Sequence, residues 1–335
     1  MDLALGFPAD CPLSPSDCVA AAQAAEEAGY SRVWVAEGRG ADSIVLATAI
    51  AMRTRSIGVG TGIAPVFNRS PWLLAMGAAA ADDLSRGRYA LGLGLGHRAV
   101  VEKRHGLAYT RPQERLRDTI LIVRAALSQH RVDYIGATMA IEGAELSYPP
   151  YRKSIPLYVA ATTARTISRA ASLADGIFLI FPTPSAVRQA RGVVIAATGH
   201  TNTRLTAYVF TCFSEDHKAA RRASRQQLAW YGRLPHYQAL FSAAGYSAEA
   251  QALTRAWATG NSSAAFSAIS DAMVDSLTAS GDASDIVHRL AALASAGLDE
   301  ATIYPYRPEA ETTHPAVYGS LLAAITPGSI SARPC

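Results

Sequence analysis

The chain has 335 residues, half of them hydrophobic and 17% charged, so it can bury a large core. Its net charge of +4 is small and no basic tract is interleaved with aromatic residues, which argues against a nucleic-acid partner. The four cysteines lack metal-finger spacing, no apolar run is long enough to cross a membrane, and the N-terminus lacks a signal-peptide pattern. These features predict a cytoplasmic protein with no metal centre and no membrane partner.

Hydrophobic segments with strand character alternate with helical segments along the whole chain. The first helix is predicted to begin near Ser14 and to end at Gly29, and most later strands are followed by a helix in the same way. The predicted strands are residues 1–7, 32–36, 56–63, 89–96, 155–160, 176–181, 204–213 and 300–306. The predicted helices after the first begin at Asp42 and near Ser70 and cover 112–127, 164–174, 185–199, 285–296 and 314–325.

Two stretches interrupt this alternation. Residues 131–151 are predicted to form a small hairpin, and residues from about 215 to 280 form a helical insertion after the seventh strand. No second domain boundary is visible. Eight strand–helix units close most naturally into a (β/α)8 TIM barrel, here residues 1–330 with a C-terminal tail at 331–335. An open, doubly wound sheet is the alternative.

In a barrel, the functional site lies where the strands end, at their carboxyl termini. This rule selects residues after several of the predicted strands, independently of any family. They are Glu37, Arg39, Asp42, Gly62, Ile63, Arg69, Gly96, His97, Arg98, Ala160, Ala161, Thr162, Thr163, Arg165, Phe181 and Tyr306.

Each of these candidates has a structural interpretation beside the functional one. Residues 161–163 precede a helix, so their N–H groups could bind phosphate, or a threonine could simply cap the helix. His97 could transfer protons or could hydrogen-bond a loop. Asp42 could pair with Glu37 but is more simply a helix cap, and Arg69 could bind an anion or lie on a loop.

Two further patterns also have both a functional and a structural interpretation. Glycines 92, 94 and 96 suggest a dinucleotide-binding loop, but the fingerprint requires a glycine where His97 stands, so small residues on a crowded barrel strand are the simpler explanation. The aromatic residues between 230 and 266 are most simply helix-packing core, although some could line a substrate pocket.

Four segments together resemble the luciferase-like monooxygenase superfamily, whose members are (β/α)8 barrels. They are AEEAGYSRVWVAE (25–37), the stretch from GVGTGIAP to LGLGLGH (58–97), IPLYVAATTARTISRAASLADGIFL (155–179) and SGDASDIVHRLAALASAGLDEATIYP (280–305). Within the superfamily, LGLGLGHRAVVEKRHGLAYTRPQERLRD (91–118) followed by RVDYIG (131–136) is most similar to the branch that uses the deazaflavin coenzyme F-420.

The resemblance implies a non-proline cis peptide between Gly62 and Ile63, behind the deazaflavin ring, and a phosphate loop at residues 161–163. It implies that His97 and Glu37 are the catalytic residues, with His97 as the proton donor, and that Glu37 and Asp42 lie near the polar head of the ring. It also implies a homodimer through the second and third helices. The cofactor-binding set that follows is Asp42, Thr61, Gly62, Ile63, Gly96, Ala160, Ala161, Thr162, Thr163 and Arg165.

One position departs from the family pattern. Many members have an acidic residue followed by a histidine after the second strand, whereas this chain has Glu37 followed by Gly38. Either His97 takes over the proton work, or the chemistry needs little acid–base help, or the activity has changed.

The sequence therefore predicts an oxidoreductase that transfers hydride between coenzyme F-420 and a small organic substrate, with the insertion covering the substrate. The first alternative is a monooxygenase that uses reduced FMN and oxygen. The second is a barrel that binds a ligand without redox chemistry. Neither the substrate nor the direction of hydride transfer is set by the sequence.

Overall fold

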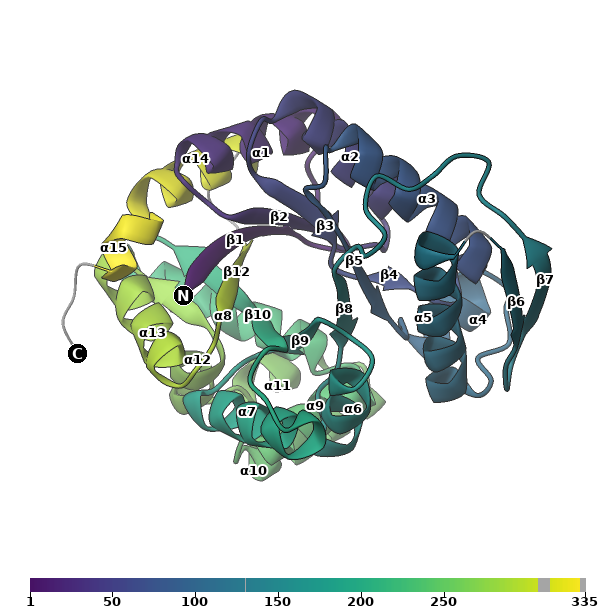
Figure 1. Ribbon diagram of the computed structural model, residues 1–335. Helices are drawn as coiled ribbons and strands as arrows, with labels where there is room; N and C mark the ends of the chain where they lie inside the picture. The colour runs from purple at the N-terminus through teal and green to yellow at the C-terminus, as the bar shows by residue number, and fades with distance from the viewer. Residues whose placement is uncertain (130, 307–313, 332–335) are drawn as a thin grey trace.

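The computed structural model describes residues 1–129, 131–306 and 314–331. Its centre is a closed ring of eight parallel strands (Figure 1). The ring closes because the strand at 204–213 pairs with the strand at 176–180, with Arg204 opposite Gly176. The strands are β1 (Asp2–Phe7), β2 (Arg32–Val35), β3 (Gly58–Thr61), β5 (Tyr89–Gly94), β8 (Leu157–Ala160), β9 (Gly176–Ile180), β10 (Arg204–Phe213) and β12 (Glu300–Pro305). The predicted (β/α)8 barrel is confirmed, and the open sheet is excluded.

A helix follows each of these strands and packs outside the ring (Figure 1). Several begin where the sequence predicted a cap: the hydroxyls of Ser14 and Ser70 accept N–H groups of the first turn, and a proline follows each. These helices are α1 (Pro15–Glu27), α2 (Ser43–Arg53), α3 (Pro71–Leu84), α5 (Pro112–Ser128), α6 (Ala164–Ala171), α7 (Pro184–Thr198), α13 (Ala283–Ser295) and α14 (His314–Ala324).

Several short elements complete the fold. The predicted hairpin is present and antiparallel, at the outer edge of the molecule beyond α5 (Figure 1). The third strand covers only Gly58–Thr61 of the predicted 56–63, and the fourth ends at Gly94, two residues before the predicted end. The remaining short elements are β4 (Ala64–Pro65), α4 (Arg98–Arg104), β6 (Val132–Ile135), β7 (Ala140–Ala144), β11 (Ala279–Gly281) and α15 (Pro327–Ser331). Of the predicted tail, residues 332–335 lie outside the described residues.

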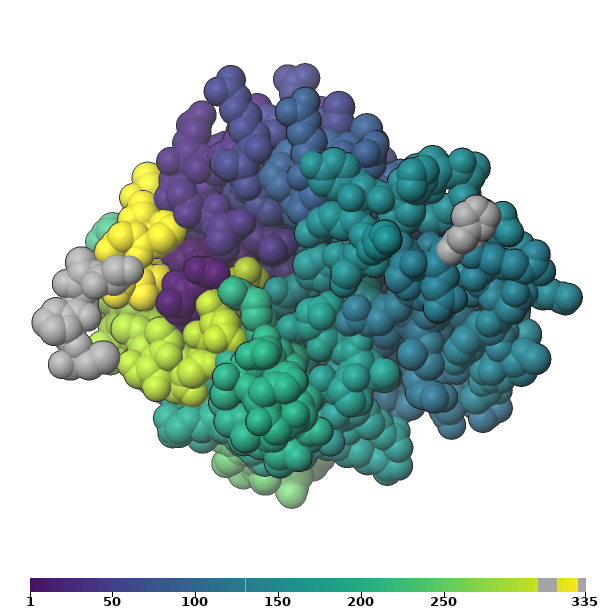
Figure 2. Space-filling model, viewed as in Figure 1, coloured from purple at the N-terminus to yellow at the C-terminus, as the bar shows by residue number. Residues whose placement is uncertain are grey.

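Large side chains fill the inside of the ring, so the space-filling view shows no open channel through it (Figure 2). Trp34 lies inside the ring of strands. Its ring centroid is 4.9 Å from that of Tyr158 and 4.7 Å from that of Phe178. Its indole N–H donates to buried Glu300 at 2.7 Å, which satisfies one oxygen of that carboxylate. The barrel is a packed core, and a ligand must therefore bind at one of its ends.

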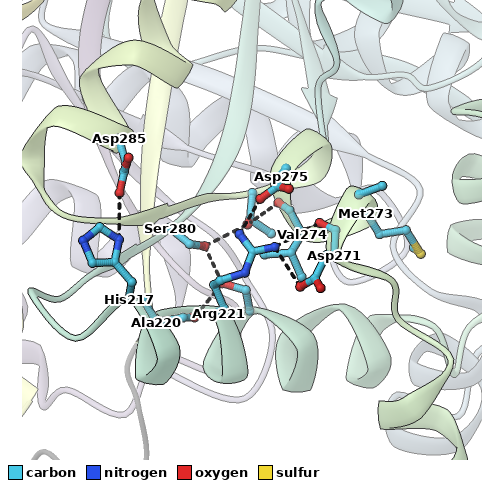
Figure 3. Close-up of polar contacts among 12 residues, drawn as sticks. His217, Ala220, Arg221, Asp271, Met273, Val274, Asp275, Ser280 and Asp285 are labelled. Carbon is cyan, nitrogen blue, oxygen red and sulfur yellow. Dashed lines mark hydrogen bonds and ion pairs between the residues drawn. The ribbon is translucent and has the colours of Figure 1, made fainter.

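The segment between β10 and α13 contains five helices: α8 (His217–Tyr231), α9 (Pro235–Ala243), α10 (Ser247–Ala258), α11 (Ser262–Ser267) and α12 (Asp271–Leu277). Ion pairs join helices within this segment, and a further contact links it to α13. Figure 3 shows Arg221 of α8 between Asp271 and Asp275 of α12, and His217 beside Asp285 of α13, 3.1 Å away. No helix in the described ranges is both long and apolar enough to span a membrane.

Candidate functional site

The carboxyl ends of β3, β5 and β8 form an accessible strip at one end of the barrel. Ala160 and Thr162 are exposed, and Ile63, Gly96 and His97 are partly exposed. We call these five residues the open rim.

The chain segments of the open rim lie close together. A Cβ atom added at Gly94 would come within 2.7 Å of Ile63 Cδ1 and 3.4 Å of Ala160 Cβ. The glycine therefore lets the three strand ends pack side by side, and small side chains leave their upper surface accessible.

The peptide bond between Gly62 and Ile63 is cis, as the resemblance implied. Neighbouring strands hold it in place. The N–H of Gly62 donates to the carbonyl of Val35 at 2.7 Å, the carbonyl of Ile63 accepts the N–H of Glu37 at 3.3 Å, and the carbonyl of Gly62 accepts the Tyr208 hydroxyl.

Sequence reasoning did not single out Tyr208. The spacing of two residues between Thr206, Tyr208 and Phe210 on β10 is the signal that could have placed it inside the barrel.

Glu37 is held by three donors at the end of β2. The Ser43 hydroxyl donates to Oε2 at 2.7 Å, the Asn68 amide donates to Oε1 at 2.7 Å, and Arg69 forms an ion pair at Oε2. Only 10% of the Glu37 side chain is exposed, against 16% for Arg69. Because both oxygens are engaged, this geometry favours a role in holding the loop after β2 over a role in proton transfer.

Asp42 caps α2, as the helix-cap interpretation predicted. Its Oδ1 accepts the N–H groups of Ile44 and Val45 at 3.0 and 3.1 Å, and its other oxygen pairs with Arg69. Burial opposes ionisation of the carboxyl, but the Val45 N–H and Arg69 outweigh it and lower the pKa of Asp42. Arg69 thus joins the end of β2 to the start of α2, and no bound anion is needed to explain its position.

Gly38, in the loop after β2, lies at the position where the resemblance implied a histidine. A Cβ atom at position 38 would collide with the carbonyl oxygen of Ala9 and approach Ala9 Cβ to 2.6 Å. The same carbonyl accepts the N–H of Arg39 at 2.6 Å. In this chain the loop after β1 therefore occupies the space that a side chain at position 38 would need.

The predicted phosphate loop lies at the exposed end of β8, where α6 begins. The Thr163 hydroxyl accepts the N–H of Thr166, and the Thr166 hydroxyl accepts the N–H of Thr163, which together form a capping box. The Thr163 hydroxyl is therefore used to cap α6. Ala161 is buried, and its N–H donates to Phe178.

Several donors of this loop remain available. Among the described residues, no acceptor is bonded to the N–H groups of Thr162, Ala164 or Arg165, or to the Arg165 guanidinium. This set of exposed donors at a helix N-terminus suits a phosphate group.

His97 lies where β5 gives way to α4. Its ring centroid is 4.8 Å from that of His236 and 5.9 Å from that of Tyr237, both on α9 of the insertion. Burial lowers the pKa of His97 and thereby favours the uncharged ring. Sequence reasoning missed His236 because nothing local connects it to a residue so distant along the chain.

The other side of the barrel mouth is closed by aromatic side chains. Phe181, Phe210, Tyr231, Tyr237 and Phe241 are all buried, and we call them the aromatic cap. The centroids of Phe181 and Phe210 are 4.4 Å apart and their rings are stacked. Three members belong to the insertion, so part of the aromatic segment at 230–266 is core that seals the barrel.

Thr61 is placed differently from the other predicted cofactor residues. It is fully buried, and its hydroxyl donates to the Gly92 carbonyl at 2.8 Å while accepting the Gly92 N–H at 3.0 Å. Its side chain joins β3 to β5 and is not offered to a ligand. For a metal ion, the described residues bring together His217, Asp282 and Asp285 at the start of α8 and α13, where they already contact one another.

The sequence profile described as luciferase-like monooxygenase matches residues 8–300. The chain belongs to this family. A 5,10-methylenetetrahydromethanopterin reductase of Archaeoglobus fulgidus is 27% identical over 289 residues, which covers 82% of this chain and 85% of that protein.

Solved structures show the same fold at lower identity. The coenzyme F-420-dependent tetrahydromethanopterin reductase of Methanopyrus kandleri superposes with a TM-score of 0.83 at 18% identity, covering 96% of this chain and 97% of that one. The oxygenating component of 3,6-diketocamphane monooxygenase of Pseudomonas putida, in complex with FMN, superposes with a TM-score of 0.71 at 15% identity over 99% and 98% of the two chains.

Proposed function

We propose that this protein is an oxidoreductase that uses coenzyme F-420 to transfer hydride to or from a small organic substrate. The observation that carries the proposal is the set of exposed donors at Thr162, Ala164 and Arg165, beside the open rim. The relatives whose names state a dependence on coenzyme F-420 support the choice of cofactor.

The residues present fit such a group. A phosphorylated cofactor needs hydrogen-bond donors for its phosphate at one end and an accessible flat surface for its ring at the other. The first are the loop donors at 162–165, and the second is the surface of Ile63 and Ala160, which the packing at Gly94 brings together. The Tyr208 hydroxyl and Trp34 occupy the inner side of Gly62, so the ring would lie on the outer side of the strand ends.

When bound, coenzyme F-420 would supply the carbon that gives or accepts the hydride. The chain's own contribution is positioning and one proton site. Arg69 fixes the loop after β2 through Glu37 and Asp42. Uncharged His97 can accept a proton from a substrate hydroxyl during oxidation and return it during reduction. The adjacent His236 and Tyr237 limit the access of water to this ring.

Anaerobic titration of the purified protein with coenzyme F-420 and, separately, with FMN tests the proposal. We expect coenzyme F-420 to bind more tightly. Arg165→Glu places a negative charge beside the proposed phosphate site and should weaken binding at least tenfold, whereas Arg169→Glu, on the same helix but in its last turn, should leave it nearly unchanged. Equal loss in both variants, or no loss in either, would contradict the assignment of this loop.

FMN remains the second candidate because one superposed structure contains it and the loop donors recognise phosphate rather than a particular ring. Tighter binding of FMN in the same titration would favour a monooxygenase if the protein also consumes oxygen once its bound FMN has been reduced. Absence of binding by either cofactor in a folded protein would favour a barrel without redox chemistry.

We also propose that the protein forms a homodimer through α2 and α3. These neighbouring helices expose large apolar side chains that a monomer would leave in water. They are Val45, Met52, Leu73, Met76 and Leu84. Light scattering after gel filtration should give the mass of a dimer, Leu73→Asp should give a monomer, and Ile195→Asp on α7, another exposed apolar position, should not.

A further inference from the structure

The loop between β1 and α1 brings two thiols together. Cys11 lies in the loop, where its N–H donates to the Pro8 carbonyl at 2.9 Å, and Cys18 lies in the first turns of α1. The two Sγ atoms are 3.9 Å apart. Cys18 is buried, whereas Cys11 is partly exposed. Both cysteines line a cavity of about 10 Å³, which is room for about one water-sized molecule.

The surroundings favour ionisation of one thiol of the pair. Contact with Cys18 favours the Cys11 thiolate, burial opposes it, and the N–H of Leu13 and the Tyr318 hydroxyl add further hydrogen bonds. The balance lowers the pKa of Cys11 to about 7. The contact with Cys11 and burial raise the pKa of Cys18, which therefore stays protonated.

We propose that Cys11 and Cys18 form a peroxide-reactive dithiol site, with Cys11 as the attacking thiolate and Cys18 as the resolving thiol. The Cys11 sulfur attacks one oxygen of hydrogen peroxide, the O–O bond breaks, and the second oxygen leaves as hydroxide and takes up a proton as water. The Cys18 sulfur then attacks the resulting sulfenic acid. An S–S bond forms, and the sulfenic oxygen leaves with two protons as a second water. The two thiols are oxidised by two electrons and the peroxide is reduced by two.

The positions of Cys11 and Cys18 allow a disulfide to form between them. A disulfide needs the sulfur atoms at about 2.05 Å, so they must approach each other by about 2 Å. Cys11 can supply that movement because it lies in a loop, whereas Cys18 is fixed in a helix. The Ala9 carbonyl in this loop accepts the N–H groups of Arg39 and Gly40, so a shift of Cys11 reaches the segment after β2.

Peptide mass spectrometry of the full chain after brief exposure to hydrogen peroxide tests the proposal. Cys335→Ser removes the terminal thiol, and buried Cys212 serves as an internal control. No lysine or arginine precedes Arg32, so trypsin leaves both cysteines on residues 1–32, and we expect this peptide to lose two hydrogens. A protease that cleaves before aspartate separates the two cysteines at Asp17, so the disulfide should then link two fragments.

Two variants separate the roles of the cysteines. Cys18→Ser should accumulate a sulfenic acid at Cys11 that dimedone traps, and Cys11→Ser should leave Cys18 unmodified. The rate of thiol loss should fall about tenfold per pH unit below about 7, with Asp10, Asp17 and Tyr318 as the other ionisable groups facing the pair.

Other outcomes would overturn the proposal. They are two intact thiols after an exposure that oxidises Cys212, a dimedone adduct that persists on Cys11 in the wild-type protein, or preferential modification of Cys18.

Discussion

The two sides of the barrel mouth differ in what the strands place at their ends. Across β3, β5 and β8, the open rim carries mostly small side chains and stays accessible. Across β9 and β10, the aromatic cap extends into the insertion and is buried. A closed ring of strands therefore does not by itself make a binding site. The site lies where small side chains leave the strand ends uncovered, and the opposite side supplies the apolar contacts that anchor the insertion.

The largest expected effect concerns the aromatic cap. Phe210 is fully buried, with ring centroids 4.4 Å from Phe181 and 4.9 Å from Tyr231. Phe210→Ala should reduce the free energy of unfolding by about 3–5 kcal/mol because it leaves a cavity that the neighbouring rings cannot fill. Urea denaturation followed by fluorescence measures this loss. Ile195→Ala, at an exposed apolar position, should cost less than about 1 kcal/mol. Similar losses in the two variants would show that the cap is not well-packed core.

The next effect concerns the loop that borders the open rim. Arg69→Met leaves Glu37 without its cation, and the carboxylate is only 10% exposed. The expected loss is about 2–3 kcal/mol, below the value for a fully buried pair because Arg69 keeps some contact with water. Arg39→Met is the matched control, since Arg39 pairs with Asp10 at the surface and should contribute less than about 1 kcal/mol. A loss after Arg69→Met no larger than that of the control would mean that Glu37 does not depend on this pair.

The same contrast separates what the sequence predicted from what it could not. All eight barrel strands and their helices follow from local patterns, such as the buried strand at β10, because each pattern is contained in a few adjacent residues. The helix start at Ser70 and its proline is another local signal of this kind. The residues at the strand ends could also be selected, since the barrel rule needs only the strand order.

Contacts between distant segments could not be predicted. The carbonyl of Ala9 fills the space beside Gly38, and His236 meets His97, yet neither pair shares a local signal. The hydroxyl of Thr61 illustrates a related limit: a residue within a predicted cofactor segment turns to bond the neighbouring strand at Gly92. Which way a side chain turns at a strand end depends on register across strands, and one strand's sequence does not contain that information.

A smaller effect distinguishes Thr162 of the open rim from its neighbour Thr163, the cap of α6. Thr163→Ala removes the cap and the capping box of α6, and should cost about 1 kcal/mol of unfolding free energy. Thr162→Ala removes an exposed hydroxyl with no bonded partner among the described residues, so stability should not change. Cofactor affinity should behave in the opposite way, falling several-fold for Thr162→Ala if its hydroxyl binds phosphate. Equal stability of the two variants would contradict the capping assignment.

The smallest effect is the pH dependence contributed by His97, where the open rim meets the insertion. Its folded pKa lies below the ordinary value of 6.5 because the ring is partly buried. Between the folded value and 6.5 the unfolded chain therefore binds more protons than the folded one, and stability falls as the pH falls through this window. His236 and Tyr237 are ionisable groups that face the ring, and a positive charge on His97 would oppose protonation of His236.

His97→Asn should make unfolding in urea less sensitive to acidification from pH 7.5 to 5.5, whereas His105→Asn, at the exposed end of α4, should not. If both variants keep the wild-type slope, the ring of His97 is solvated as freely as that of an exposed histidine, and the insertion does not shield the proton site that the proposed hydride transfer requires.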